Sequence, residues 1–381
     1  MLSGLIAFLP ALGNKMSNKM VPVTVLTGFL GSGKTTLLKR ILTEFHGRRI
    51  AVIENEFGPE SIDNELLVQD SEEEIIELNN GCVCCTVRGD LQRTLLDLKE
   101  RREKGELSFE RVMIETTGVA NPGPVCQTFF IDEEVASYYM LDAVITVVDA
   151  KHGMETLDTQ PEAQQQVGFA DRILLSKLDL VSEEEHKALY KRLVHMNPRA
   201  KITPVNFGEV DLNSIIDISG FNLNAVLDID PEFLKEDNHH DHEHHHHHHH
   251  DHECDEHCHH DHKHDHECDE HCHHHDHHHA HHDDEIGAFL FTSDKPFDPI
   301  KLDDFLSGLV QVYGPDLYRY KGILYIKGAP VRYLLQGVHM ILGTNPGKPW
   351  GSNEKKHNKI VFIGRKLPQE IFKQGLTQCL A

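Results

Sequence analysis

The chain has 381 residues, 39% of them hydrophobic, and a formal net charge of −24 at pH 7. This length suggests two domains with room for a real core. The strong negative charge, without any run of lysine and arginine, argues against binding to nucleic acid or to an anionic membrane. Seven of the nine cysteines fall in two tight clusters beside other metal-type ligands, which favours reduced thiols and a cytoplasmic protein over a disulfide framework.

The first residues carry a short apolar stretch that resembles the core of a signal peptide. No basic residue precedes this stretch, and it is far below the roughly 18 apolar residues of a membrane span. We therefore expect residues 1–19 to be a disordered leader, with translation starting at Met1, Met16 or Met20.

Residues 20–221 alternate short β-branched runs with longer helical ones. Runs such as Ala143 to Val148 are apolar without alternation, which is typical of strands covered by helices on both faces. The pattern predicts an α/β domain with a parallel sheet. Residues 222–285 form a linker with a low-complexity stretch, and residues 286–381 have the short strand and helix patterns of a small α+β domain with an antiparallel sheet.

The sequence GFLGSGKTT, Gly28 to Thr36, fits the phosphate-binding P-loop pattern and stands between a predicted strand and a predicted helix. Its glycines allow backbone N–H groups to approach phosphates, Lys34 reaches the β- and γ-phosphates, and the Thr35 hydroxyl binds Mg²⁺. The nucleotide-binding residues expected in this loop are Gly28, Gly31, Ser32, Gly33, Lys34, Thr35 and Thr36.

Two further segments follow predicted strands; the first resembles a Mg²⁺ and γ-phosphate site, and the second indicates a guanine nucleotide. In RVMIETTG, Glu115 and Gly118 occupy the positions where P-loop GTPases carry a carboxylate near Mg²⁺ and a glycine that senses the γ-phosphate. In LLSKLD, Lys177 and Asp179 resemble the guanine-reading motif, with Ser176 in place of the usual asparagine; an ordinary strand-end turn is the alternative. The expected catalytic residues are Lys34, Thr35 and Glu115.

The segment GCVCC places three thiols within a few residues, at Cys82, Cys84 and Cys85. Thiolates select Zn²⁺ or Cu(I) over Mg²⁺, and three ligands with a vacancy suit metal transfer better than permanent structural zinc. The alternative is that these cysteines pack in a core.

These motifs, in the order GFLGSGKTT, IENEFG, GCVCC, ETTG and SKLD, resemble the CobW family of GTPases, which is related to HypB and UreG. The C-terminal segments RYKGILYIKG, PWG and VFIG are similar to the second domain of that family. The resemblance implies slow GTP hydrolysis with Mg²⁺, coupled to transition-metal binding at the CxCC motif, and a role as metallochaperone or metal insertase. It also implies Glu54 as a further metal ligand. Relatives carry a glutamate directly after ENEFG, whereas Pro59 stands here and Glu60 follows, which leaves that carboxylate in doubt.

The stretch from Asp237 to Glu285 holds 26 of the 32 histidines, interleaved with acids and cysteines. Such a composition cannot form a core, and imidazoles at this density favour zinc, nickel, cobalt and copper. The sequence HDHECDEHCHH occurs twice and supplies candidate ligands at His250, His252, Cys254, His257, Cys258, His264, His266, Cys268, His271 and Cys272. Because histidine must be neutral to coordinate, this reservoir should release metal below a pH of about 6.5. The alternative is a polar linker that binds metal only incidentally.

Three functions are compatible with these features. The first is a GTPase that delivers zinc to client proteins, the second loads cobalt or nickel, and the third is a metal store whose P-loop is regulatory at most. A nucleotide-dependent homodimer is expected from the class, while the client and the activating residue for hydrolysis are not identifiable from the sequence. Outside these motifs, Cys126 and Cys379 are expected in cores, and Trp350 in packing of the second domain or in an interdomain contact. His339 is expected in a core or at a domain interface.

Overall fold

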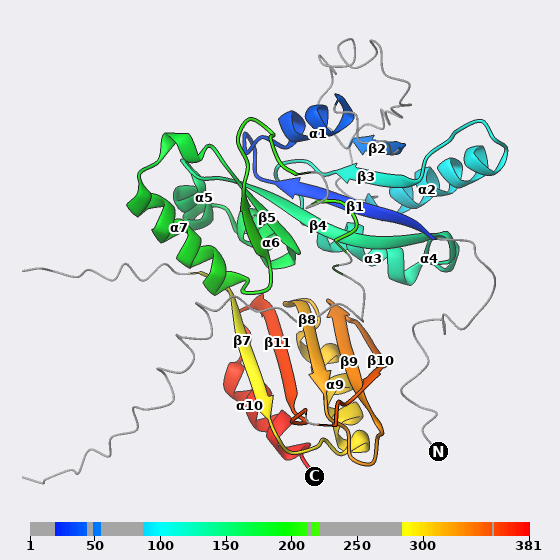
Figure 1. Ribbon diagram of the computed structural model, residues 1–381, viewed down its shortest axis with the longest axis vertical. Coiled ribbons are helices and arrows are strands. Elements are labelled where there is room, and N and C mark those ends of the chain that lie inside the picture. The colour runs from blue at the N-terminus through cyan, green and yellow to red at the C-terminus, as the bar shows by residue number, and fades with distance from the viewer. Residues whose placement is uncertain are drawn as a thin grey trace, which may run out of the picture.

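The computed structural model of the chain describes residues 20–43, 49–54, 87–211, 215–218, 220, 284–352 and 354–381. These residues form two sheets, which lie one above the other in Figure 1. The predicted leader and the histidine-rich repeats lie outside the described residues, so the structure does not test them.

The first sheet has six parallel strands in the order β2-β3-β1-β4-β5-β6. They are β1 (Val21–Gly28), β2 (Ile50–Glu54), β3 (Arg111–Glu115), β4 (Tyr139–Asp149), β5 (Arg172–Ser176) and β6 (Lys201–Pro204). The helices of this part are α1 (Lys34–Thr43), α2 (Val87–Glu103), α3 (Gly123–Ile131), α4 (Glu133–Tyr138), α5 (Gly153–Thr159), α6 (Pro161–Phe169), the short η1 (Leu178–Leu180) and α7 (Glu183–Met196). The predicted parallel α/β sheet is confirmed.

Both faces of this sheet are buried, which explains the apolar strand sequences. Met113 of β3 packs with Leu37 and other residues of α1 in one cluster. Its neighbours Val112 and Ile114 belong to a second cluster on the opposite face, with residues of α2, α3, α6 and α7. Successive residues of a strand point to opposite faces, so burial on both sides requires apolar residues throughout.

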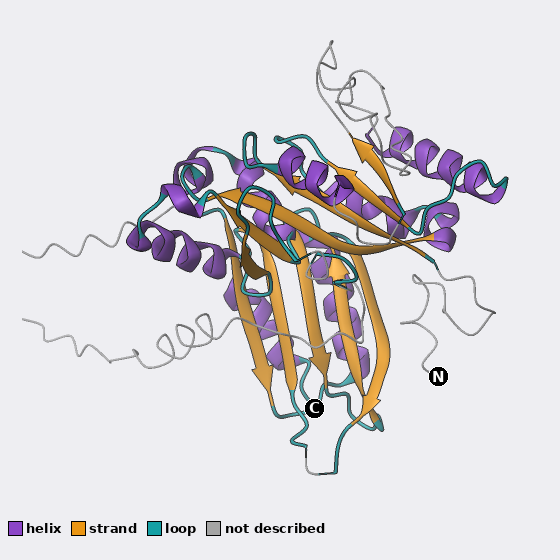
Figure 2. Cartoon of the chain, turned by 45° about the horizontal axis from the view of Figure 1, so that its top comes forward, coloured by secondary structure: helices purple, strands orange, loops and turns teal. Residues whose placement is uncertain are grey.

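The second sheet is antiparallel, in the order β10-β9-β8-β11-β7. Its elements are β7 (Ile286–Ser293), α9 (Pro299–Tyr313), β8 (Leu317–Leu324), β9 (Val331–Val338), β10 (Ile341–Pro349), β11 (Asn358–Arg365) and α10 (Gln369–Gln378). Figure 2 shows helices along one face of these strands. Phe289, Phe362 and Phe372 pack between that face and the helices, with ring centroids 5.2 to 5.3 Å apart. The predicted α+β second domain with an antiparallel sheet is confirmed.

The two sheets share a hydrophobic core at their junction. Phe169, at the end of α6, stacks on Tyr318 of β8 with the ring centroids 4.9 Å apart. Val338, Val361 and other residues of the second sheet belong to the same buried cluster as the helices under the first sheet. The domains are therefore packed on each other through apolar contacts as well as polar ones.

A buried ion pair crosses this junction. Arg319 of β8 lies 2.6 Å from Asp171, the residue before β5, and the two side chains are only 1% and 3% exposed. Asp171 also accepts a hydrogen bond from the backbone N–H of Val144. Removing either side chain of this pair should destabilise the fold, because the other charge would then be buried without compensation.

Residues 221–283 lie outside the described residues, and the residues on either side of them, Gly220 and Asp284, contact the folded domains. Gly220 lies against Asp171, and its carbonyl oxygen accepts a hydrogen bond from Arg319. Asp284 pairs with Arg192 of α7 at 2.6 Å, and Glu285 pairs with Lys366 at 2.7 Å. Both ends are thus held by the domain junction.

His339 lies in the turn between β9 and β10, buried against the first domain. Its ring is 5.0 Å from that of Phe169, and its Nδ1 is 3.1 Å from the carbonyl oxygen of Gly314. Its Nε2 faces Gly123 at the start of α3, where a methyl group would lie only 2.4 Å from it. Burial lowers the pKa of His339, against the opposing effects of the Gly314 carbonyl and Asp316. His339 is therefore a buried histidine at the domain interface.

Acidification should destabilise the protein through this residue. Folded His339 has a lowered pKa, so below its ordinary value of about 6.5 the unfolded chain binds more protons than the folded one. Stability is then lost as the pH falls from about 6.5 towards the folded pKa, by at most about 1.4 kcal/mol per pH unit. His339→Asn, which tolerates the positive φ of 50° at this site, should flatten the dependence of unfolding free energy on pH between 7.5 and 5.5. Equal slopes for variant and wild type would contradict the prediction.

The structure also locates the two isolated cysteines and the tryptophan that were considered in the sequence analysis. Cys126 and Cys379 are buried, as expected. Trp350 packs within the second domain, where the guanidinium of Arg332 lies 4.5 Å from its ring centroid. No helix among the described residues has the length and apolar character needed to cross a membrane.

Candidate nucleotide-binding site

The loop between β1 and α1 has the conformation that phosphate binding requires. Gly31 and Gly33 have φ of 73° and 102°, a region that residues with side chains rarely adopt. At Gly28 a Cβ atom would lie 2.3 Å from the carbonyl oxygen of Val147, so only glycine fits. The chain then enters α1, whose first residues are Lys34 and Thr35. The loop thus brings backbone N–H groups and a helix N-terminus to one place.

Lys34 folds back over this loop. Its Nζ donates hydrogen bonds to the carbonyl oxygens of Gly28 at 2.8 Å and of Phe29 at 3.2 Å. Burial lowers the pKa of Lys34, and the charge of Glu115 opposes that shift. The ammonium is therefore held at the loop, where phosphate oxygens would be its stronger partners.

Thr35 and Glu115 meet at the carboxyl edge of the sheet. The Thr35 hydroxyl donates a hydrogen bond to Oε1 of Glu115 at 3.2 Å, and Glu115 is the last residue of β3. A hydroxyl and a carboxylate from two rigid elements form a donor set that suits Mg²⁺, which prefers oxygen ligands and keeps several waters. The two residues therefore fit the Mg²⁺ of a Mg²⁺–nucleotide complex.

The segment after β3 is fastened to the P-loop and to α6. At Gly118 a Cβ atom would lie 2.6 Å from the backbone nitrogen of Leu30, so the two loops touch. The side-chain amide of Gln166 donates hydrogen bonds to the carbonyl oxygens of Gly118 at 3.0 Å and Ala120 at 3.1 Å. Gln166 was not foreseen from the sequence, where a run of three glutamines gives no sign of its role.

The guanine-reading segment is tied to the same loop. The Ser176 hydroxyl donates to the carbonyl oxygens of Ser32 at 2.7 Å and Val148 at 3.2 Å, so this serine links β5 to the P-loop and to β4. Lys177 follows with a φ of 57°, and the exposed Asp179 lies in η1. The serine therefore makes the links that hold Lys177 and Asp179 beside the P-loop.

Comparison with known proteins agrees with this geometry. The CobW/HypB/UreG nucleotide-binding domain matches residues 22–204, and the cobalamin synthesis protein CobW C-terminal domain matches residues 286–380. The zinc chaperone YjiA of Escherichia coli is 39% identical over 351 residues, which is 92% of this chain and 96% of YjiA. The chain belongs to the CobW/HypB/UreG family of P-loop GTPases.

Other members of the CobW family extend this comparison. The zinc-regulated GTPase metalloprotein activator 1 of Schizosaccharomyces pombe is 39% identical over 212 residues, 53% of this chain and 50% of that protein. The crystal structure of Zn(II)-bound YjiA GTPase from E. coli superposes with a TM-score of 0.70 at 32% identity, covering 95% of this chain and all of that one. The similarity to YjiA thus includes both domains.

In this CobW-family chain, Asp149 and His152 extend the site beyond the sequence motifs. Asp149 ends β4 and accepts from Lys177 Nζ at 2.7 Å, while His152 Nδ1 lies 3.0 Å away. Burial alone would raise the pKa of Asp149, but hydrogen bonds from Lys177, His152 and the backbone of Lys151 lower it, so the group is a carboxylate. A polar residue at the end of a buried parallel strand was the signal that could have identified it.

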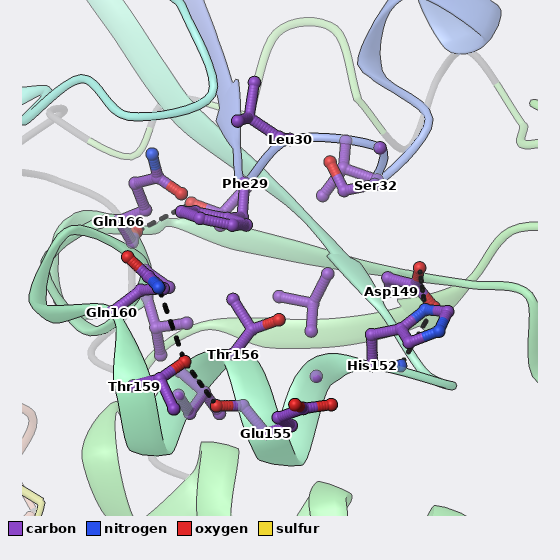
Figure 3. A pocket seen from close by; sticks show the side chains of 18 of the residues that line it. Phe29, Leu30, Ser32, Asp149, His152, Glu155, Thr156, Thr159, Gln160 and Gln166 are labelled. Atoms are coloured by element: carbon purple, nitrogen blue, oxygen red, sulfur yellow. Dashed lines mark hydrogen bonds and ion pairs between the residues drawn. The ribbon is translucent and has the colours of Figure 1, made fainter.

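A cavity of about 450 Å³ lies beside the P-loop (Figure 3). Phe29 and Leu30 of the loop form one wall, and Figure 3 shows Glu155 and Thr156 of α5 opposite them. Asp149 and His152 lie together at one end of the cavity. Lys34 and Thr35 are not among its lining residues, but Gly31, Ser32 and Lys177 are, so the cavity borders the predicted nucleotide site.

The structure does not test the predicted ligands of transition metals. Cys82, Cys84 and Cys85 and all ten candidate ligands of the repeats lie outside the described residues, as does the side chain of Glu54. Within the part of the chain that the structure describes, no three histidine, cysteine, aspartate or glutamate side chains form a metal-binding group. The backbone of Glu54, the last residue described before the cysteines, pairs in register with that of Glu115, the predicted Mg²⁺ ligand.

Proposed function

We propose that the protein is a GTP-hydrolysing metallochaperone that binds zinc at Cys82, Cys84 and Cys85 and delivers it to client proteins. The observation that carries the proposal is the Thr35–Glu115 hydrogen bond beside Lys34, because it assembles the ligands of a Mg²⁺–triphosphate at one sheet edge. Two relatives named as a zinc chaperone and a zinc-regulated GTPase support zinc as the cargo. A cytoplasmic location stays a prediction.

In this proposal, each group of site residues binds a different part of the Mg²⁺–GTP complex. Lys34 and the N–H groups of the P-loop bind and orient the β- and γ-phosphates. Thr35 and Glu115 would hold Mg²⁺, which when bound neutralises charge on these phosphates. Lys177, held by Asp149, and Asp179 bind the base, and the Gly118 segment contacts the γ-phosphate. Positioning without an activating partner gives slow hydrolysis.

Coupling between nucleotide and zinc would run through β2 and β3. Glu54 and Glu115 are neighbours in these paired strands, and Cys82 lies 28 residues after Glu54 in the sequence. A nucleotide that rearranges the edge around Glu115 and Gly118 therefore acts next to Glu54, the further metal ligand of this proposal. By linkage, zinc must then change nucleotide affinity by the same factor by which nucleotide changes zinc affinity.

The histidine-rich stretch serves in this proposal as a reservoir that loads the cysteine site. Its ten repeat ligands and the surrounding imidazoles would hold several ions near neutral pH and release them as the histidines protonate. A client metalloprotein would receive the ion from the cysteines, and a nucleotide-dependent homodimer would form during the cycle.

The test is steady-state GTP turnover by chelated protein, to which Zn²⁺, Co²⁺ or Ni²⁺ is returned. We expect Zn²⁺ to change the rate in wild type but not in Cys84→Ala, since that thiolate would be a ligand. Cys379→Ala, which removes a thiol in the second domain, should respond like wild type. Replacing residues 237–283 by a glycine–serine linker, which keeps the anchoring Asp284 and Glu285, should lower the number of bound zinc ions while keeping the rate response.

Two outcomes would overturn this proposal in different ways. A rate that ignores every metal, with binding confined to the histidine-rich stretch, would point to a metal store. A response to Co²⁺ or Ni²⁺ alone would replace the proposed cargo.

A further inference from the structure

Phe207 is an exposed aromatic residue in an unfavourable backbone conformation. It follows β6, is 76% exposed, and has a φ of 45°. A positive φ is uncommon for a large side chain, and strained residues of this kind cluster at functional sites. Exposing the ring to water is also unfavourable. The fold itself gains little from phenylalanine here.

The turn that carries Phe207 is held firmly in place. Asn206 and Glu209 are bridged, and the Glu209 N–H donates to the Asn206 carbonyl oxygen at 2.7 Å. A Cβ atom at Gly208 would lie 3.2 Å from the carbonyl oxygen of Thr36 in α1. Glu209 also pairs with Arg40 of the same helix at 3.3 Å. The turn thus packs on the helix that begins with Lys34 and Thr35.

Strand pairing brings the same turn to the base-binding segment. Leu175 of β5 is in register with Pro204 of β6, and the Val205 N–H donates to the Leu175 carbonyl oxygen at 3.0 Å. Lys177 is two residues beyond Leu175, and Phe207 is two residues beyond Val205. The two residues therefore emerge side by side at the carboxyl edge of neighbouring parallel strands, with the start of α1 next to them.

A guanine held at its edge by Asp179 still has two flat faces to be covered. Aromatic side chains stack on bases with a gain of about 1–3 kcal/mol per base. From the exposed ring, its strained and anchored turn, and its place beside Lys177, we propose that Phe207 stacks on the guanine ring of the bound nucleotide. This inference rests on the proposed binding of GTP.

The decisive variant is Phe207→Asn, measured for GDP affinity by calorimetry and for thermal stability. Phe207 and Gly208 both have positive φ, as in a type I′ turn, and Asn-Gly is the preferred pair there. The variant should therefore unfold at the same or a higher temperature, yet bind GDP on the order of tenfold more weakly. The opposite directions of the two effects distinguish stacking from a structural role.

Two controls complete the experiment. Phe207→Tyr keeps the ring and should bind GDP like wild type. Ile300→Ala removes another exposed apolar side chain, 72% exposed on α9, and should also bind normally. GDP affinity of wild-type strength in Phe207→Asn, or a loss in Phe207→Tyr as large as in Phe207→Asn, would overturn the inference. Absence of GDP binding by wild type would instead overturn the proposed function.

Discussion

Lys34→Ala is expected to lower GTP turnover by about 10²–10³-fold, the typical cost of removing one preorganised charged or hydrogen-bonding group from a transition state. Lys34 is held at the P-loop by two carbonyl oxygens, next to the Thr35–Glu115 pair. No other ammonium group of the P-loop motif can replace it. The measurement is phosphate release by purified variant and wild type under identical Mg²⁺ and GTP concentrations.

The matched control is Lys39→Ala, which removes a second lysine from the same helix, five residues further along. It should retain turnover close to that of wild type. Circular dichroism should show that both variants fold. Turnover by Lys34→Ala at the wild-type level would mean that hydrolysis takes place elsewhere than at this loop.

Arg319→Met should destabilise the protein by about 3–5 kcal/mol, because it leaves the carboxylate of Asp171 buried without its partner. Both side chains are almost fully buried, and Asp171 is additionally fixed by the N–H of Val144. The pair joins the two domains, so the loss should appear as a lower unfolding midpoint in denaturant and in heat. The double variant Arg319→Met/Asp171→Asn should recover part of the loss.

A surface pair gives the comparison for this effect. Arg365 of β11 also binds an aspartate, Asp316, through two nitrogens at 2.6 and 2.8 Å, but both side chains are substantially exposed. Arg365→Met should therefore cost less than about 1 kcal/mol. Equal losses in the two variants would show that the burial of Arg319 does not determine its contribution.

The first sheet could be predicted from the sequence, but four of its helices could not. Strands such as β4 and β5 are buried on both faces, and their uninterrupted apolar runs show it. By contrast, α6 buries Gln164 and Gln166, whose amides donate to backbone carbonyl oxygens. A helix whose buried side is partly polar lacks the regular spacing of apolar residues by which helices are predicted. The helices α3, α4 and α5 are too short to show such a spacing.

The candidate site was predictable where chemistry follows from local spacing. Lys34 and Thr35 are fixed by the P-loop pattern, and Glu115 by the end of a strand. Asp149 and Gln166 belong to no motif, because they act through residues that are distant in the sequence, Lys177 and Gly118. Their roles arise from tertiary packing.

The anchoring of Gly220 and Asp284 at the domain junction has an evolutionary consequence. For a flexible insertion between fixed ends, the entropic cost of closing the loop grows by only about 0.6 kcal/mol for each doubling of length. If the repeats form the flexible reservoir proposed above, duplication or deletion of a unit such as HDHECDEHCHH would leave the stability of both domains almost unchanged. Under the proposed reservoir role, storage capacity would then change by replication slippage and be selected by metal supply, independently of the nucleotide chemistry.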